Sequence, residues 1–181
     1  MKKWLVVPSV VMAMSLWSCD PVDPVDPHDE ELITTLNIDL DGGMHTATLN
    51  YVDADGDGGN DPVITVDTLL ANTTYQGAIT VLNESETPAE DITPEIFDEA
   101  DQHQFFFATT GSANFAYLDQ DNDGYPVGLS FELTTGAAGT ENITVTLRHE
   151  PAKSAAGVAD GDLTEAGGET DIEVVFEVIV E

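Results

Sequence analysis

The sequence predicts an all-β protein, an immunoglobulin-like β-sandwich of about nine strands with one short helix, which follows a signal peptide and an extended tether. Apolar and polar residues alternate over several short segments, as in strands that bury one face. Clusters of Gly, Asp and Asn separate these segments at short intervals, as in two-sheet sandwiches. Apolar residues make up 41% of the 181 residues, enough for a packed core. We therefore expect one folded domain, residues 31–181.

Residues 1–18 have the pattern of a lipoprotein signal peptide. Two lysines follow Met1, and a mainly apolar segment of about 14 residues comes next, from Trp4 to Trp17. The segment closes on Leu16-Trp17-Ser18-Cys19, which resembles a bacterial lipobox, and Cys19 is the single cysteine. We expect cleavage before Cys19 and lipidation of its thiol, so that this lipid holds the protein on a membrane. The alternative is a small buried cysteine after an ordinary secretory signal.

Residues 19–30 predict an extended tether. Asp and Pro recur every three residues between Asp20 and Pro27, and proline disfavours helix in the residue before it. Acidic residues directly after a lipidated cysteine resemble the surface-export signal of Bacteroidota lipoproteins. That resemblance implies a location on the outer face of the outer membrane.

In the first half of the domain, the alternation of apolar and polar residues is most regular in the first strand and in the strand at residues 75–82. The first strand alternates apolar Leu36, Ile38 and Leu40 with polar residues, and a Gly-Gly turn leads into the second. Tyr75 and Ile79 stand in a longer strand of the same period. The expected strands of the whole domain cover residues 32–40, 45–52, 63–66, 75–82, 104–109, 114–118, 127–134, 142–149 and 171–180.

One helix is expected, at residues 94–100. Thr93-Pro94 reads as an N-cap followed by the first helical position, where proline is well tolerated. Ile96, Phe97 and Ala100 would form its buried stripe. The next segment, Phe105-Phe106-Phe107, cannot point all its rings to one side of a strand. One or two rings should enter the core and the other should pack under the acidic helix; the alternative is an exposed aromatic that binds a partner.

The last strand has the clearest alternation. The residues expected to face the core are Ile172, Val174, Phe176, Val178 and Val180. Those expected to face solvent are Asp171, Glu173, Glu177 and Glu181, with Val175 and Ile179 as exceptions.

The charge balance excludes several function classes. The chain has 35 acidic residues against 4 Lys and Arg, a net charge of −31. Cleavage before Cys19 would leave only Arg148 and Lys153 as cations and a net charge of −33. Binding of nucleic acid needs a basic face, and so does a polybasic hold on anionic lipid. The single cysteine excludes an internal disulfide and a cysteine-based zinc site.

Two acidic loops have the alternating spacing of calcium ligands. The second loop carries acids at positions 1, 3 and 5 and Gly at position 6, as in the first half of an EF-hand loop, but Ser130 stands where the EF-hand has Glu. In the first loop, four carboxylates within nine residues repel one another unless a cation lies among them. The candidate calcium ligands are Asp53, Asp55, Asp57 and Asp61 in the first loop and Asp119, Asp121 and Asp123 in the second. The alternative at both loops is an ordinary Asp/Asn/Gly turn.

His103 and His149 are the candidate ligands of a transition metal. His103 opens an expected strand and His149 ends another, each with acidic residues nearby. If these two strands pair, two imidazoles and neighbouring carboxylates can bind zinc or copper. The alternative is two polar residues at strand ends. His28 and His45 have weaker claims.

Several short segments resemble a family of small Bacteroidota surface lipoproteins. The similarity runs over residues 32–181 and rests on six segments in one order, namely 55–60, 69–75, 82–85, 103–107, 147–151 and 166–171. The usual label of this family, type 1 periplasmic-binding fold, implies alternating βαβ units, whereas the alternation described above predicts antiparallel strands. The family supplies no catalytic residues. The resemblance implies a surface lipoprotein that works beside a TonB-dependent transporter.

No catalytic pattern stands out in the sequence, which has no nucleophile–base pair, Walker loop, dinucleotide fingerprint or HExxH motif. We expect a non-enzymatic, calcium-stabilised binding module for a metal ion or a protein partner, accessory to an outer-membrane transporter. The alternative is a structural or adhesive cell-surface module without a small ligand.

Overall fold

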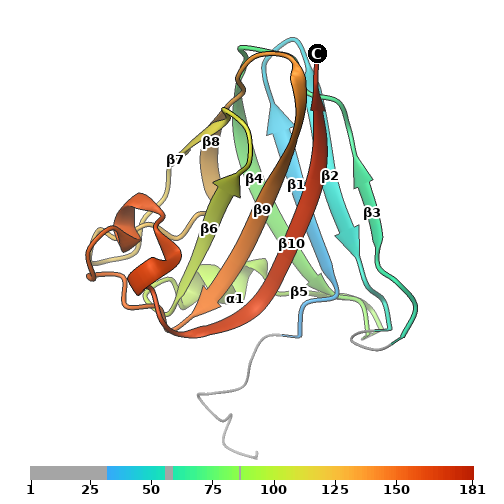
Figure 1. Ribbon diagram of the computed structural model, residues 1–181. Coiled ribbons are helices and arrows are strands. Elements are labelled where there is room, and N and C mark those ends of the chain that lie inside the picture. Colours follow the sequence, from blue (N-terminus) through green and yellow to red (C-terminus); the bar gives the residue numbers. More distant parts are fainter. Residues whose placement is uncertain (1–31, 56–58, 86) are drawn as a thin grey trace, which may run out of the picture.

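A computed structural model describes residues 32–55, 59–85 and 87–181, which form two antiparallel sheets packed face to face (Figure 1). This arrangement confirms the predicted all-β sandwich, and it differs from the alternating parallel βαβ units that the family label implies. The expected signal peptide, Cys19, the tether and Asp57 lie outside the described residues. Within the described part of the chain, no helix is long and apolar enough to cross a membrane.

The larger sheet has the strand order β3-β2-β1-β4-β8-β7, and a short strand β5 pairs with the end of β4. Neighbouring strands in this order are antiparallel. The strands are β1 (Thr35–Asp41), β2 (Thr46–Val52), β3 (Val63–Val66), β4 (Thr74–Asn83), β5 (Glu90–Asp91), β7 (Asn114–Tyr117) and β8 (Ser130–Thr134).

The smaller sheet has the order β10-β9-β6, built from β6 (His103–Thr109), β9 (Gly139–His149) and β10 (Glu169–Val180). β10 pairs with β9 along its whole length. Near its start, the register shifts between Thr170 and Ile172, so that Asp171 is the extra residue of a β-bulge. The prediction that Asp171 faces solvent is wrong, because its side chain has 0% exposure. The bulge breaks the alternation on which that prediction relied.

The core lies between the two sheets and follows the predicted alternation. Every second side chain of β1, β4 and β10 is buried, whereas Val175 and Ile179 are exposed as the sequence indicates. The inward side chains of β10 are Ile172, Val174, Phe176, Val178 and Val180, none more than 8% exposed. Burying one such side chain stabilises the fold by about 1.5–3 kcal/mol.

The helix α1 (Thr93–Asp98) differs in detail from the sequence prediction. Its N-cap position is held by Ile92, and Thr93 is the first helical residue. The hydroxyl of Thr93 instead accepts a hydrogen bond from the backbone N–H of Val81. Ile96 is buried as expected, but Phe97 is 59% exposed. A helix of six residues buries only a narrow stripe against the sheet, and Phe97 lies beside that stripe.

The three phenylalanines of β6 point to both faces of the sheet, as expected. The ring outside the main core, however, packs against a different segment from the one predicted. Phe105 enters the main core, and Phe106 forms a second small core with Val158 and Ala166. The segment 150–168, with the short helices η1 (Val158–Asp160) and η2 (Leu163–Glu165), therefore covers Phe106, and the acidic helix does not. The reason is that Phe106 projects from the outer face of the smaller sheet, whereas Phe105 projects from its inner face.

Residues 127–129 are not part of a strand, although the sequence predicts one from 127 to 134. This segment crosses from one sheet to the other. The carbonyl of Val127 accepts from the N–H of Phe105 in β6, and the carbonyl of Leu129 accepts from that of Ile79 in β4. Its backbone bonds therefore go to both sheets, which a ladder in one sheet does not permit.

Candidate functional site

The structure brings His103 and His149 together at one end of the sandwich. β6 begins at His103, β9 ends at His149, and the two residues are direct partners in the antiparallel register. Their rings stack with centroids 4.8 Å apart and planes 7° from parallel. The condition set by the sequence, that the two strands pair, is therefore met. This histidine end is the lower end of the sandwich in Figure 1, beside α1.

His103 presents one ring nitrogen without a hydrogen-bond partner. Its side chain has 0% exposure, and its Nδ1 lies 3.2 Å from the carbonyl oxygen of Glu99. Because a carbonyl only accepts, Nδ1 carries the proton, and Nε2 of the neutral ring holds a lone pair. Among the described residues, this buried Nε2 has no hydrogen-bond partner. The ring is thus fixed in the tautomer that binds a metal through Nε2.

The environment keeps His103 neutral at neutral pH. Burial lowers its pKa to about 4, and the charges of His149 and Lys153 act in the same direction. The hydrogen bond to Glu99 and the charge of Asp101 oppose this effect without outweighing it. An ion pair between His103 and a carboxylate therefore forms only in acid.

Asp171 is a residue of this site that the sequence analysis missed. Its Oδ2 lies 4.0 Å from Nε2 of His103, and both side chains have 0% exposure. This distance is beyond the range of a hydrogen bond. The bulge of β10 turns the Asp171 side chain inward. Nothing in the local pattern indicates a bulge at this position, except that two glycines precede the strand.

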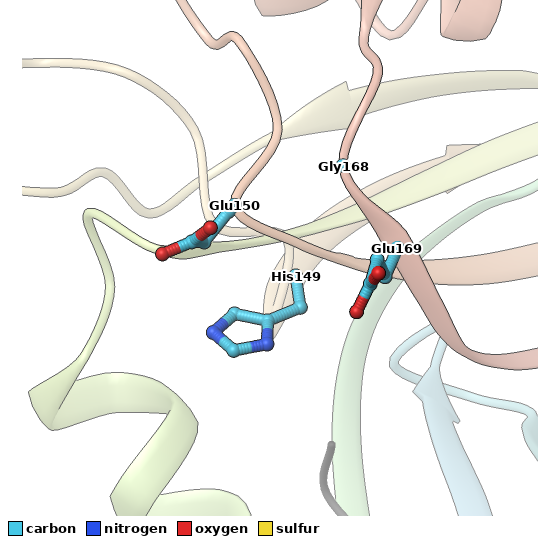
Figure 2. A pocket seen from close by; sticks show the side chains of 4 residues that line it. All are labelled: His149, Glu150, Gly168 and Glu169. Atoms are coloured by element: carbon cyan, nitrogen blue, oxygen red, sulfur yellow. The ribbon is translucent and has the colours of Figure 1, made fainter. Parts of the chain in front are cut away.

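A pocket opens beside the histidine pair, lined by His149, Glu150, Gly168 and Glu169, with a volume of about 360 Å³. Figure 2 shows the carboxylates of Glu150 and Glu169 on either side of the His149 ring. Glu150 has a φ of 50°, a conformation that costs a residue with a side chain about 1 kcal/mol or more. At Gly168, with a φ of 69°, an added Cβ would lie 2.2 Å from the carbonyl oxygen of His149. Only glycine fits there, so the backbone that forms the pocket is closely packed.

The second acidic loop is held by donors of the protein itself. Asp119 accepts from the N–H groups of Gly128 and Ser130. Asp121 is 7% exposed and accepts from the N–H groups of Asp123 and Tyr125, and its Oδ2 lies 3.0 Å from the ammonium of Lys153.

The positive charge beside Asp121 is thus a lysine, whose ammonium also donates to the carbonyls of Ala100 and Pro126. Burial raises the pKa of Asp121, but the bonds from Tyr125 and Lys153 outweigh this and hold the pKa below its ordinary value. Asp123 is exposed, and the three carboxylates of this described loop form no group that could hold a metal ion.

The first acidic loop is described only in part. Asp55 and Asp61 are exposed. The carboxylate of Asp55 accepts from the backbone and side-chain nitrogens of Asn60, and these bonds lower its pKa. Asp53 accepts from the hydroxyl of Tyr51. Asp57 lies outside the described residues.

No preformed metal site exists among the described residues, in the sense of three or more His, Cys, Asp or Glu side chains arranged to hold an ion. The nearest approach to one is the histidine end, with two stacked imidazoles and a buried carboxylate. Imidazole nitrogen and carboxylate oxygen together suit zinc, copper and similar ions. His45 lies at the opposite end of the sandwich, where its Nδ1 shares a hydrogen bond with the Tyr75 hydroxyl.

Comparison of the chain with protein-family models, with curated proteins and with solved structures finds no match.

Proposed function

We propose that this protein is a non-enzymatic, lipid-anchored binding module of the outer-membrane surface, which binds a divalent transition metal ion, Zn²⁺ or Cu²⁺, at His103 and His149. One observation carries the metal proposal: His103 is fully buried, and its Nε2 lone pair has no hydrogen-bond partner among the described residues. The ring of His149 lies beside it at the edge of the pocket, with its plane 7° from parallel, so one of the two rings must rotate before both bind the same ion.

A bound cation gives this nitrogen the partner that it lacks. Leaving a buried acceptor unsatisfied costs about 1–3 kcal/mol. Histidine ligands of metals commonly donate their other ring N–H to a backbone carbonyl or a carboxylate, and Nδ1 of His103 has this relation to Glu99. Nε2 of His103 is therefore held in a fixed orientation before any ion binds.

The charge of the protein favours cations in general. A net charge of −31 over the chain raises the concentration of cations near the surface. Of the two basic residues in the described part of the chain, Lys153 is buried against Asp121. The sequence pattern of residues 1–30 and the resemblance to Bacteroidota surface lipoproteins support the anchor and the surface location. They also support a partner role for a TonB-dependent transporter.

A structural or adhesive module is the second candidate. It is favoured by the edge strand β3, where Val63 is 63% and Ile64 is 44% exposed. An apolar strand at the edge of a sheet is a template for pairing with another chain. Concentration-dependent association without metal binding would favour this function over the first.

The test is a calorimetric titration of the mature chain with ZnCl₂ and with CuCl₂. We expect about one ion per chain and a loss of affinity of about ten-fold or more in His149→Ala. His45→Ala is the matched control, because it removes a histidine at the opposite end, and it should leave the affinity unchanged. Absence of binding by the wild type, or equal effects of the two variants, would refute the metal site.

The anchor needs a separate measurement. The intact mass of the native protein should lack residues 1–18 and include lipid on Cys19, and protease added to whole cells should remove the protein. An uncleaved or unlipidated form would contradict the lipoprotein proposal.

A further inference from the structure

We infer that the pocket between the end of α1 and the second acidic loop receives an arginine side chain of a partner protein. Its lining includes an aromatic ring, two carboxylates and two amides, which belong to Phe97, Asp98, Asp101, Gln120 and Asn122. This pocket shares no lining residue with the pocket beside the histidine pair. The interaction surface is therefore separate from the proposed metal site and does not depend on it.

A buried ammonium holds the two walls of this pocket together. Nζ of Lys153 donates to the carbonyl of Ala100 on the helix side and lies 3.0 Å from Oδ2 of Asp121 on the loop side. Both Ala100 and Asp121 line the pocket, whereas Lys153 does not and is only 5% exposed. The walls are thus fixed before a partner binds, and a preformed pocket loses less conformational entropy on binding.

The cation for these carboxylates must come from another protein. Neither Asp98 nor Asp101 forms an ion pair with a described residue. The described part of the chain has two basic side chains, of which Lys153 is buried and Arg148 donates to the Thr170 hydroxyl. The described part of a second copy of this chain therefore offers no free lysine or arginine. The net charge of −31 opposes association of two copies and favours a basic partner.

The chemistry of the lining suits a guanidinium group. The Phe97 side chain is 59% exposed, and a planar guanidinium stacks on an accessible aromatic face while its N–H groups donate to carboxylates. The amide oxygens of Gln120 and Asn122 are further acceptors for its five donors. The volume of about 200 Å³ is below the roughly 300–1,000 Å³ of typical small-molecule sites, so the pocket suits one side chain better than a cofactor.

The test is an NMR titration of the ¹⁵N-labelled mature chain with a short blocked peptide of glycines around one arginine. The buffer contains about 150 mM NaCl, which screens long-range attraction to the acidic surface. The backbone N–H resonances of residues 97–101 and 120–122 should shift and reach saturation. We expect the lysine analogue of the peptide to bind about three-fold or more weakly. The citrulline analogue, which has a similar shape without the charge, should not bind.

Two variants and one control locate the binding. Phe97→Leu removes the aromatic face but keeps an apolar side chain, and it should weaken binding by about two- to five-fold. Asp98→Asn should weaken binding by about three-fold or more. Glu95→Gln is the matched control, because it removes one charge from the same helix outside the pocket. It should change the affinity by less than about 1.5-fold.

Saturable shifts at this pocket that weaken in Phe97→Leu and Asp98→Asn would support the inference. Equal affinity for the arginine and lysine peptides, or equal effects of Asp98→Asn and Glu95→Gln, would overturn it. Thermal melting checks that each variant folds, and the three substituted side chains are exposed. Should a variant not fold, the wild type decides, because absence of saturable shifts at residues 97–101 also overturns the inference. The assay contains no metal ion, so such a failure leaves the proposed histidine site standing.

Discussion

Replacing Lys153 by Met should destabilise the fold strongly, because this lysine joins three segments through one buried ammonium. Its three donors are matched by three acceptors, namely the carbonyls of Ala100 and Pro126 and the carboxylate of Asp121. These acceptors belong to the segment after α1 and to the 119–129 loop, while Lys153 itself belongs to the segment that covers Phe106. The side chains of Lys153 and Asp121 are 5% and 2% exposed.

The size of the effect follows from what the substitution leaves behind. Breaking a buried ion pair by removing one partner costs about 3–5 kcal/mol, because the other charge stays buried. Asp121 keeps two bonds from backbone N–H groups, so we expect the lower end, about 3 kcal/mol. For a domain of this size, that loss lowers the Tm by about 6–12 °C.

The assay is urea unfolding of the mature chain at neutral pH, followed by circular dichroism. Arg148→Met is the matched control, since Arg148 is the other Lys or Arg among the described residues and its guanidinium donates to the Thr170 hydroxyl on the surface. It should cost about 1 kcal/mol. Asp121→Asn and the double variant complete a cycle that isolates the Lys153–Asp121 term. A loss below about 1 kcal/mol for Lys153→Met would refute the reasoning from the buried ion pair.

Three further predictions concern pH, backbone geometry and calcium. The folded pKa of His103, about 4, lies below the ordinary 6.5. The unfolded chain therefore binds more protons between these values, and stability should fall by roughly 3 kcal/mol as pH drops from 6.5 to 4. Urea unfolding across this range should show a shallower fall in His103→Gln, and equal slopes would contradict the pKa. Gly168→Ala should destabilise the fold by roughly 2 kcal/mol or more and weaken Zn²⁺ binding, because the Cβ of the alanine would collide with the His149 carbonyl oxygen. Gly43→Ala, at a φ of 80° with open space around it, should cost only about 1 kcal/mol and leave Zn²⁺ binding unchanged. Calcium should raise the Tm more than Mg²⁺ or NaCl at matched ionic strength. Asp55→Asn should remove this difference in Tm, whereas Asp123→Asn should leave it unchanged. Equal rises in Tm with all three salts would contradict the calcium prediction.

Much of the fold could be predicted because the strand pattern is local. In β10 and β4, the side chains of alternate residues face opposite sides, so the inward residues are readable from the chain alone. From the sequence, the pairing of His103 with His149 could be stated only as a condition for a metal site. Each residue stands at the end of an expected strand, but no local pattern says which strands become neighbours.

Three features depended on the tertiary structure. The bulge that buries Asp171 is set by how β10 pairs with β9. The acidic loop at 119–124 has the spacing of calcium ligands, yet its buried carboxylate faces Lys153, which is 32 residues away in the chain. Phe106 is covered by a segment more than forty residues later. The sequence by itself determined the period-2 strands, the acidic charge and the N-terminal pattern from which lipidation is predicted, because these depend on neighbouring residues. Contacts between distant segments, which only the packed sandwich creates, decide which carboxylate pairs with a cation. They also decide which imidazole is buried away from solvent.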